Sequence, residues 1–224
     1  MIDNGAAAPS PSYRLIPSKF PPIGLFDTVT TVADAEAVME LAGWTNDRLV
    51  EDRLRRLPEA EWVYGRPNSS VVMASFLHVA PAGGRFHGPD LGAWYASAEL
   101  RTAAFEVAHH LRREAVATGA RTLQRDYRTY TAELSGSYLD VRGRQAEWTE
   151  IYDPASYAAS QTFGERVRSS GGAGIIYDSV RHIGGVNVVG YRPQQILNVT
   201  QTNHWRIGVE AASPRIHMER LTGS

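Results

Sequence analysis

Three polar residues in the segment GGRFHGPDLGAWYASAELRTAAFEV, residues 83–107, could form a chemical site. Arg85 follows two glycines, which allow a tight turn that presents the arginine. Its guanidinium carries a planar fork of donors suited to phosphate or carboxylate. Tyr95 lies in a short apolar run, and Glu106 lies in a helical pattern. Taken singly, they could equally be a surface cation, a core aromatic and an exposed carboxylate.

The environment of Glu106 depends on which side of its helix is covered. At 100° per residue, Glu106 lies roughly 130° from the centre of the apolar face. That apolar face contains Leu100, Ala103, Ala104, Val107 and Leu111. The flank of Glu106 also contains Glu99, His109, His110 and Arg113. Glu106 is therefore either exposed and paired with His110 one turn later, or catalytic in a cleft that this flank lines.

A second polar cluster interrupts two apolar segments in IIYDSVRHIGGVNVVGY, residues 175–191. Ser179 and Arg181 follow the first segment, Gly184 and Gly185 precede the next, and Asn187 lies within that next segment. A loop on a rigid base can carry functional side chains, although an ordinary loop with a solvated arginine is the alternative. The seven histidines form no pattern typical of zinc ligands, so we expect no metal site.

Composition narrows the class of protein. The chain has 224 residues, a formal net charge of −1, 43% hydrophobic residues and no cysteine. The absence of cysteine excludes disulfides and thiolate catalysis. The net charge lacks the basic excess that is typical of a nucleic-acid-binding surface. The N-terminus does not have the pattern of a signal peptide, and no apolar run is long enough for a membrane helix. We expect a cytoplasmic protein without a membrane partner.

The candidate site residues must be positioned by helices and strands, which the sequence pattern predicts as follows. Residues 1–12 are predicted to form a disordered tail, and residues 13–24 an extended segment that carries Arg14. Residues 69–79 could form a buried strand or a short buried helix. Helices are predicted over residues 31–41, ending at Gly43, and over residues 46–57 and 154–168. A further helix is predicted from Ser97 as N-cap to residue 117, ending at Gly119.

Strands are predicted around Tyr95, on both sides of a turn near Gly136, and in three later segments. The later segments are residues 174–177, 185–191 and 196–209. Because strands and helices do not alternate strictly, we expect an α+β fold whose mixed or antiparallel sheet has flanking helices. A single domain over residues 13–215 is predicted, with tails at residues 1–12 and 216–224.

These motifs together resemble the RES-domain toxins of bacterial toxin–antitoxin pairs. The resemblance runs from YRLIPSKFPPIGLFD through GGRF, WYAS and TAAFEV to IIYDSVRHIGGVNVV, over roughly residues 13–191. Arg85, Glu106 and Ser179 match the arginine, glutamate and serine that give the family its name. Arg14 matches the N-terminal arginine of the family, and His87 stands where the family often has Asn or Ser.

The resemblance implies an α+β fold similar to ADP-ribosyltransferase toxins and an activity on NAD. It implies catalytic roles for Glu106, Arg85 and Tyr95, with Tyr95 stacked on the nicotinamide ring. The substrate-binding residues that it implies are Arg14, Ser179, Arg181 and Asn187. NAD is then the substrate and inorganic phosphate a co-substrate, and no prosthetic group is implied.

Three activities stay open on this basis. The first is a toxin that degrades NAD by phosphorolysis or hydrolysis of the nicotinamide–ribose bond. The second is an ADP-ribosyltransferase that modifies a host protein, and the third is a nucleotide-binding protein without turnover. The resemblance also implies a cognate helix-turn-helix antitoxin of the Xre type as partner, and a homodimer within that complex. DNA contact is expected from the partner rather than from this chain.

Overall fold

The computed structural model describes residues 5–19, 24–45 and 56–222, and they form an α+β fold around one mixed, mostly antiparallel sheet. The strands are β1 (Gly5–Ala6), β2 (Ser12–Pro17), β3 (Trp94–Ser97), β4 (Thr122–Leu134), β5 (Tyr138–Asp140), β6 (Gly174–Asp178), β7 (Val186–Gly190), β8 (Ile196–Glu210) and β9 (Ile216–Leu221). The helices are α1 (Val32–Thr45), α3 (Ser69–Leu77), α4 (Leu100–Thr118) and α5 (Ala158–Ser169), with short 3-10 turns at Glu59–Glu61 and Pro193–Gln195. No described helix is long and apolar enough to cross a membrane.

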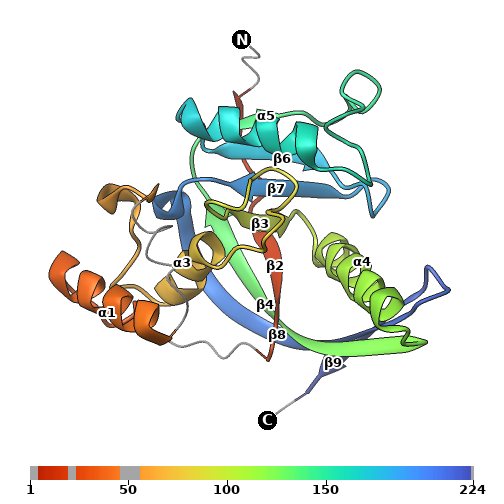
Figure 1. The fold of residues 1–224 in the computed structure, drawn as a ribbon, viewed down its shortest axis with the longest axis horizontal. Helices are drawn as coiled ribbons and strands as arrows, with labels where there is room; N and C mark the ends of the chain where they lie inside the picture. The colour runs from red at the N-terminus through yellow and green to blue at the C-terminus, as the bar shows by residue number, and fades with distance from the viewer. Residues whose placement is uncertain (1–4, 20–23, 46–55, 223–224) are drawn as a thin grey trace.

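The sheet consists of two halves that meet at one point. The strand order is β1-β5-β6-β7-β3-β2-β4-β8-β9, and β5 and β6 are the parallel pair. β2 pairs with β4 along its whole length, but with β3 only through Tyr13 and Ser97. In Figure 1 the half with β6 and β7 accordingly runs across the view, whereas β2, β4 and β8 run down it. The strands diverge beyond the Tyr13–Ser97 pair.

The helices cover both faces of this sheet. α3 packs in the core cluster that contains Trp94 and Ala96 of β3. Tyr95 belongs to the cluster of the opposite face, together with residues of α5. α4 packs on the other half of that same face, against Leu15 of β2. Because α4 and α5 lie on one face (Figure 1), the part of the sheet between them is where the two halves meet.

The helices agree with the sequence pattern in the centre of the chain and differ at their ends. Residues 69–77 form α3, with Phe76 and Met73 fully buried, so the ambiguous segment is a helix. α4 ends before Gly119, whose φ of 69° is left-handed, as predicted. Its N-cap is Glu99 and not Ser97, because Ser97 is still part of β3.

The first and last predicted helices also differ in extent. α1 continues to Thr45, past the glycine that was expected to end it. α5 begins at Ala158 and not at residue 154, because the Asp153 carboxylate accepts the backbone N–H groups of Ala155 and Ser156 and holds a turn there. The predicted helix over residues 46–57 falls almost entirely on residues 46–55, outside the described residues.

The three later strands are confirmed as β6, β7 and β8. The chain turns at Gly136 between β4 and β5, but these strands are not partners, since β5 pairs with β1 and β6. Both predicted tails contain strands instead: β1 pairs with β5, and β9 pairs with β8 from His204 to Val209. The backbone pairing that orders these ends comes from partners far along the chain, which local composition does not reveal.

Candidate active site

Glu106 is held by side chains from a strand and a loop opposite its helix. Its Oε1 accepts a hydrogen bond from Ser179 Oγ at 2.7 Å and another from Asn187 Nδ2 at 2.6 Å. Asn187 Oδ1 in turn accepts from Ser97 Oγ at 2.7 Å. Ser97 and Asn187 are buried and stand opposite each other in the β3–β7 register. The carboxylate is thus fixed by a chain of hydrogen bonds across two strands, and within the described structure Oε2 has no protein donor.

Glu106 is half-buried, which argues against the exposed carboxylate that was one of the two possibilities. Its flank of α4 faces β7 and the loop after β6, so the carboxylate is not simply exposed. His110 forms no hydrogen bond with it among the described side chains, and the two interact through charge. Burial lowers the pKa of His110, while the negative charge of Glu106 raises it.

The loop that carries Ser179 is fastened to α4. Ser179 Oγ accepts the backbone N–H groups of Arg181 and His182, at 3.1 and 3.0 Å, which leaves its hydrogen directed to Glu106. The His182 ring stacks on Phe105 at 4.6 Å, and its Nδ1 lies 2.9 Å from Thr102 Oγ1. A Cβ on Gly185 would lie 2.7 Å from Thr102 and 2.8 Å from His182, so glycine is required for this close approach.

Arg85 lies at the tip of the tight turn that its glycines predicted. Gly83 has a φ of 70°, and Gly84 N–H donates to the His87 carbonyl at 3.0 Å. The buried Arg85 side chain donates through Nη1 to the carbonyls of Ile151 and Asp153, at 3.1 and 3.0 Å. Its Cζ lies 4.7 Å from the centre of the Tyr157 ring. Nη2 is buried without a partner among the described residues, so one side of the fork is available to an anion.

Tyr95 supports the Arg85 turn. Its hydroxyl oxygen accepts the Phe86 N–H at 2.9 Å, and its ring is tilted against His87 at 5.6 Å. Burial raises the pKa of the Tyr95 phenol, which is therefore neutral at physiological pH. Burial also lowers the pKa of His87, whose Nδ1 lies 2.7 Å from the Gly88 carbonyl oxygen.

Arg14 lies where β2 and β3 diverge. Its Nη1 donates to the Tyr95 carbonyl at 2.8 Å, and its Cζ lies 4.9 Å from the centre of the Trp94 ring. Burial lowers the pKa of Arg14 to about 10, so it stays charged at neutral pH. Arg181 Nη2 donates to the Pro154 carbonyl at 2.9 Å. Arg85 and Arg181 therefore hold the same segment, residues 151–154, from two sides.

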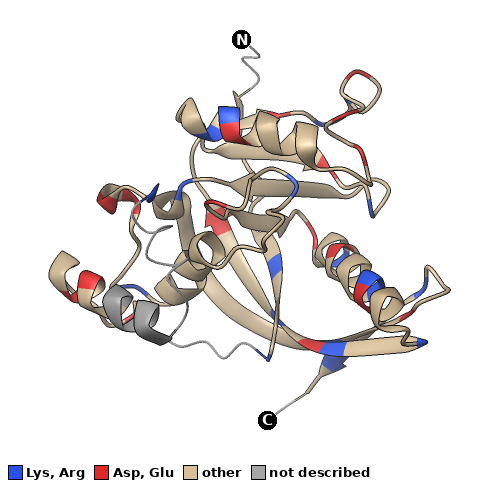
Figure 2. Ribbon diagram, in the orientation of Figure 1, with Lys and Arg blue, Asp and Glu red and all other residues tan. Residues whose placement is uncertain are grey.

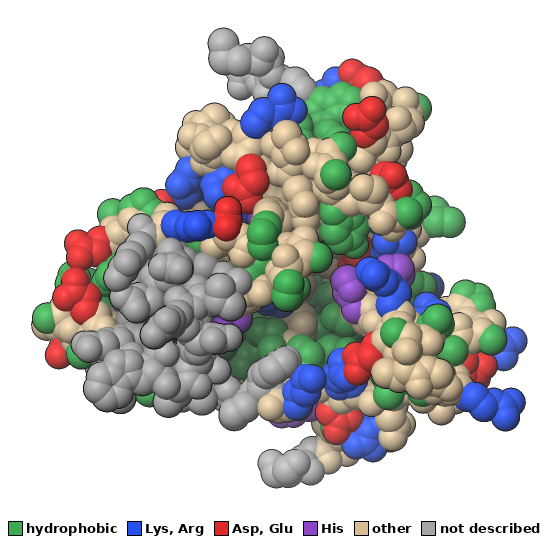
Figure 3. Space-filling model, in the orientation of Figure 1, with side chains coloured by type: hydrophobic (Ala, Val, Ile, Leu, Met, Phe, Trp, Pro, Cys, Tyr) green, Lys and Arg blue, Asp and Glu red, His purple; other side chains and the backbone are tan. Residues whose placement is uncertain are grey.

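Tyr177 connects the glutamate and arginine sides. It stands opposite Asn187 in the β6–β7 register, so the two side chains share a face, and its ring lies 4.7 Å from that of Phe86. Burial is the main reason that the pKa of Tyr177 lies well above its usual range; the negative charge of Glu106 raises it further, and Arg85 lowers it. Both charged residues thus act on one phenol. This face of the molecule is hollowed beside α4, with hydrophobic side chains on the floor (Figure 3).

Charge elsewhere on this face is mixed, with basic and acidic residues both present on α4 and α5 (Figure 2).

The two adjacent histidines of α4 lie close to each other: the rings of His109 and His110 are 5.5 Å apart. Burial, and secondarily the positive charge of Arg181, lower the pKa of His109 to about 4. Among the described residues, no three histidine or acidic side chains gather as a metal ion would require.

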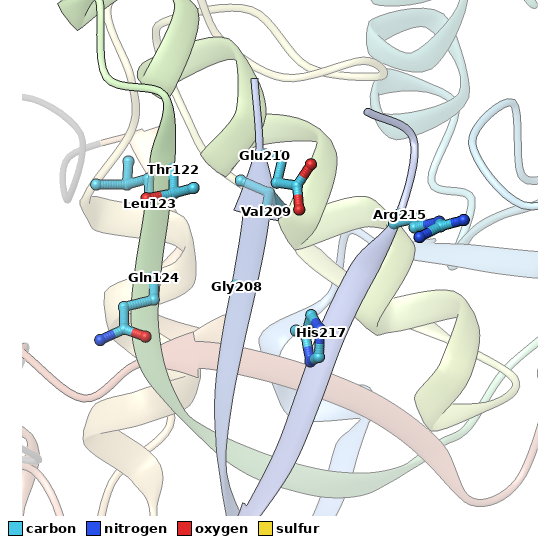
Figure 4. A pocket seen from close by; sticks show the side chains of 8 residues that line it. All are labelled: Thr122, Leu123, Gln124, Gly208, Val209, Glu210, Arg215 and His217. Carbon is cyan, nitrogen blue, oxygen red and sulfur yellow. The ribbon is translucent and has the colours of Figure 1, made fainter. Parts of the chain in front are cut away.

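A separate groove lies beyond the end of α4, along the edge formed by β4, β8 and β9. Figure 4 shows the residues that line it: Thr122, Leu123, Gln124, Gly208, Val209, Glu210, Arg215 and His217. None of the residues predicted from the sequence to carry chemistry belongs to this groove.

Several residues of the site were not predicted to belong to it. Ser97 was expected to cap α4, yet its hydroxyl orients Asn187. Tyr177, His182 and Tyr157 were not singled out. The alternation of β3 carried a partial signal, because Tyr95 and Ser97 two residues apart must share a face. The same rule places Tyr177 on the face of Asn187 only once the register of β6 and β7 is known.

The family of this chain is shown by comparison with known proteins. Residues 53–210 match the family described as RES domain, a range that includes Arg85, Glu106 and Ser179 but not Arg14. An uncharacterized protein of Sinorhizobium fredii, y4oC, is 24% identical over 200 residues, which are 87% of this chain and 80% of that protein. A chain from the crystal structure of the M. tuberculosis MbcT–MbcA toxin–antitoxin complex is similar over 55% of this chain and 73% of its own, with a TM-score of 0.42 and 19% identity. The family match covers more than half of the sequence, and the chain belongs to the RES-domain family.

Proposed function

We propose that this protein is an NAD-degrading enzyme that cleaves the nicotinamide–ribose bond, with phosphate or water as the acceptor. The observation that carries the proposal is the Glu106 carboxylate, fixed by Ser179 and Asn187 on one side of Tyr177 while Arg85 offers a free donor on the other. The resemblance to RES-domain toxins implies the same activity, and the RES-domain match over residues 53–210 supports it.

The reaction breaks the bond between the ribose C1 and the nicotinamide nitrogen. Nicotinamide leaves with the bonding electron pair, and positive charge develops at the ribosyl centre. An acceptor oxygen from phosphate or water then forms a bond to C1 and loses a proton to solvent. Glu106 stabilises the positive charge electrostatically, and its Oε2 can accept a hydrogen bond from a ribose hydroxyl. A carboxylate that is already held in place needs no reorganisation in the transition state.

The cationic side chains suit the pyrophosphate of the same substrate. Arg85 keeps Nη2 unpartnered within the described structure, and Arg14 keeps Nε unpartnered. A guanidinium fork matches phosphate oxygens in geometry and charge. Arg181 is assigned to the pyrophosphate or to the incoming phosphate, because it approaches the same segment, residues 151–154, as Arg85. Tyr95 is assigned to the support of Arg85, in place of the nicotinamide contact that the resemblance implies, because its hydroxyl accepts the Phe86 N–H of the turn that carries this arginine.

The test is to incubate the purified protein with NAD, with and without inorganic phosphate, and to quantify nicotinamide and ADP-ribose products. ADP-ribose 1″-phosphate formed only with phosphate supports phosphorolysis, and free ADP-ribose supports hydrolysis. Labelled protein in a mixture with cell extract and labelled NAD would support the transferase instead. If no condition releases nicotinamide, the enzyme proposal fails and the nucleotide-binding alternative takes its place.

The proposed biological role is that of a cytoplasmic toxin held inactive by a helix-turn-helix antitoxin, within a complex that contains a homodimer of this chain. The support for this role is the RES-domain family itself. Such a partner must block access to Glu106, so the adjacent gene product is the first candidate to test. Addition of that protein at equimolar concentration should stop nicotinamide release; unchanged release would reject it as the inhibitor.

A further inference from the structure

The hydroxyl of Tyr177 has no hydrogen-bond partner among the residues that the structure describes. The side chain is buried, with 6% of the residue exposed, in the strand that leads to Ser179. Among the described residues, no group forms a hydrogen bond with its hydroxyl, although the ring packs against Phe86. The hydroxyl oxygen is not among the fully enclosed polar atoms that lack a partner, so part of it is open to solvent and can meet a group that arrives from outside.

The tyrosines around it show the opposite behaviour. Tyr191 donates its hydroxyl to the Phe86 carbonyl at 2.9 Å, and Tyr95 accepts the Phe86 N–H at the same distance. Tyr152 donates to the Val141 carbonyl at 2.8 Å. Each of these phenols fixes the backbone of a loop or turn. Tyr177 is as buried as Tyr152, with 6% of each residue exposed, but has no such structural task among the described residues.

The groups near Tyr177 indicate what would bind there. The negative charge of Glu106 and the positive charge of Arg85 both act on its phenol, and burial raises its pKa so that it keeps its hydrogen. The hydroxyl can therefore donate, and an acceptor oxygen beside it would take its hydrogen. In a dinucleotide whose sugar lies at Glu106 and whose phosphates lie at Arg85, the oxygens between them belong to the ribose–phosphate unit.

We propose that Tyr177 is a further substrate-binding residue, whose hydroxyl donates a hydrogen bond to an oxygen of the ribose–phosphate unit of a dinucleotide held between Glu106 and Arg85. This inference rests on the proposed function and adds a contact that neither Glu106 nor the arginines supply. The contact is made in the ground state and in the transition state alike, so its loss affects binding more than turnover.

The test compares Tyr177→Phe with Tyr138→Phe. Both substitutions remove one buried hydroxyl, but Tyr138 lies in the core cluster of the opposite face, and only burial affects its pKa. Tyr177→Phe keeps the ring that contacts Phe86, so the thermal midpoint should change little. We expect the KM for NAD and the Kd of ADP-ribose, measured by calorimetry, to rise about tenfold with kcat nearly unchanged. Tyr138→Phe should leave both constants at the wild-type value.

The possible outcomes separate this inference from the proposed function. If the wild type turns over NAD and Tyr177→Phe has the same KM and Kd, the inference is wrong while the function stands. An equal increase in both variants also overturns it, because the effect would then belong to any buried hydroxyl. If the wild type neither releases nicotinamide nor binds ADP-ribose, the proposed function fails and the Tyr177 contact fails with it.

Discussion

The two sides of Tyr177 are built in opposite ways. On the side of Glu106, the contacts come from two regular elements and one loop that is tied to them: α4 carries the carboxylate, β7 carries Asn187, and the loop of Ser179 is hydrogen-bonded back to α4. On the side of Arg85, a glycine turn carries the guanidinium, and backbone carbonyls of the irregular segment 151–154 accept from it. On the first side, Oε1 of Glu106 already accepts two hydrogen bonds. On the second side, Nη2 of Arg85 is a buried donor with no partner in the described structure.

This difference separates two tasks. A group that stabilises charge in a transition state must be held in position before the reaction, and a rigid helix and strand provide that. A group that binds an anion needs a hydrogen-bond donor that no protein acceptor already satisfies, and a loop with few contacts can adjust its position around the ligand. We therefore expect substitutions on the Glu106 side to lower kcat, and substitutions on the Arg85 side to raise KM.

The largest effect is expected for Glu106→Gln. The amide keeps the shape and one acceptor oxygen but removes the negative charge, so kcat for nicotinamide release should fall by roughly 10²–10³. The thermal midpoint should stay within a few degrees of wild type. Glu99→Gln, at the exposed N-cap of the same helix, is the matched control and should keep full activity. Wild-type kcat in Glu106→Gln would remove this residue from the mechanism.

Ser179→Ala is expected to have the next largest effect. It removes one of the two donors to Glu106 and the acceptor for two backbone N–H groups of its loop. Hydrogen bonds to charged groups contribute about 1.5–3 kcal/mol, so kcat should fall roughly 10- to 100-fold. Ser75→Ala in α3, whose hydroxyl donates to the Val72 carbonyl, is the control serine. A raised KM with unchanged kcat would show that Ser179 binds substrate and does not position Glu106.

Arg85→Lys tests the other side. Lysine keeps the charge but loses the planar fork, so the KM for NAD should rise about tenfold with a smaller change in kcat. Arg144→Lys, at a half-buried arginine that pairs with Glu147 away from the site, should leave KM unchanged. A fall in kcat as large as that of Glu106→Gln, with KM unchanged, would contradict the division of tasks between the two sides.

The smallest expected effect concerns pH and the histidines of α4. His109 has a pKa of about 4 in the fold, against an ordinary value of 6.5, because it is partly buried among positive charges. Below pH 6.5 the unfolded chain binds a proton that the folded chain refuses, so the free energy of unfolding decreases as pH falls towards 4. Denaturant unfolding of wild type and His109→Gln at pH 7 and 5 checks this. The variant should lose less stability at pH 5; an equal loss would contradict the shifted pKa.

The sequence was informative where local pattern determines structure. The apolar spacing of α4 and Gly119 after it predicted the helix and its end, and the glycines before Arg85 predicted the turn. The chemical residue types of Arg85, Glu106 and Ser179 were recognisable for the same reason. Pattern could not say what lies opposite the Glu106 flank, because that depends on β3 and β7 pairing across long chain separations.

The features that the sequence predicted wrongly depend, in the same way, on contacts between segments far apart in the chain. Ser97 has the side chain of a helix cap, but its partner is Asn187, and only the β3–β7 register brings the two together. β1 and β9 looked like tails because each is short or polar, and their order comes from β5 and β8. The role of Tyr95 in holding Phe86 likewise depends on a turn that folds back over its strand.

The central claim is that one dinucleotide spans both sides of Tyr177, and a crystal structure of Glu106→Gln with NAD tests it most directly. The slow variant should retain intact NAD. We predict the ribose next to nicotinamide within hydrogen-bonding distance of residue 106, and the pyrophosphate against Arg85. NAD bound in the groove of β4, β8 and β9, or with its pyrophosphate away from Arg85, would contradict the account.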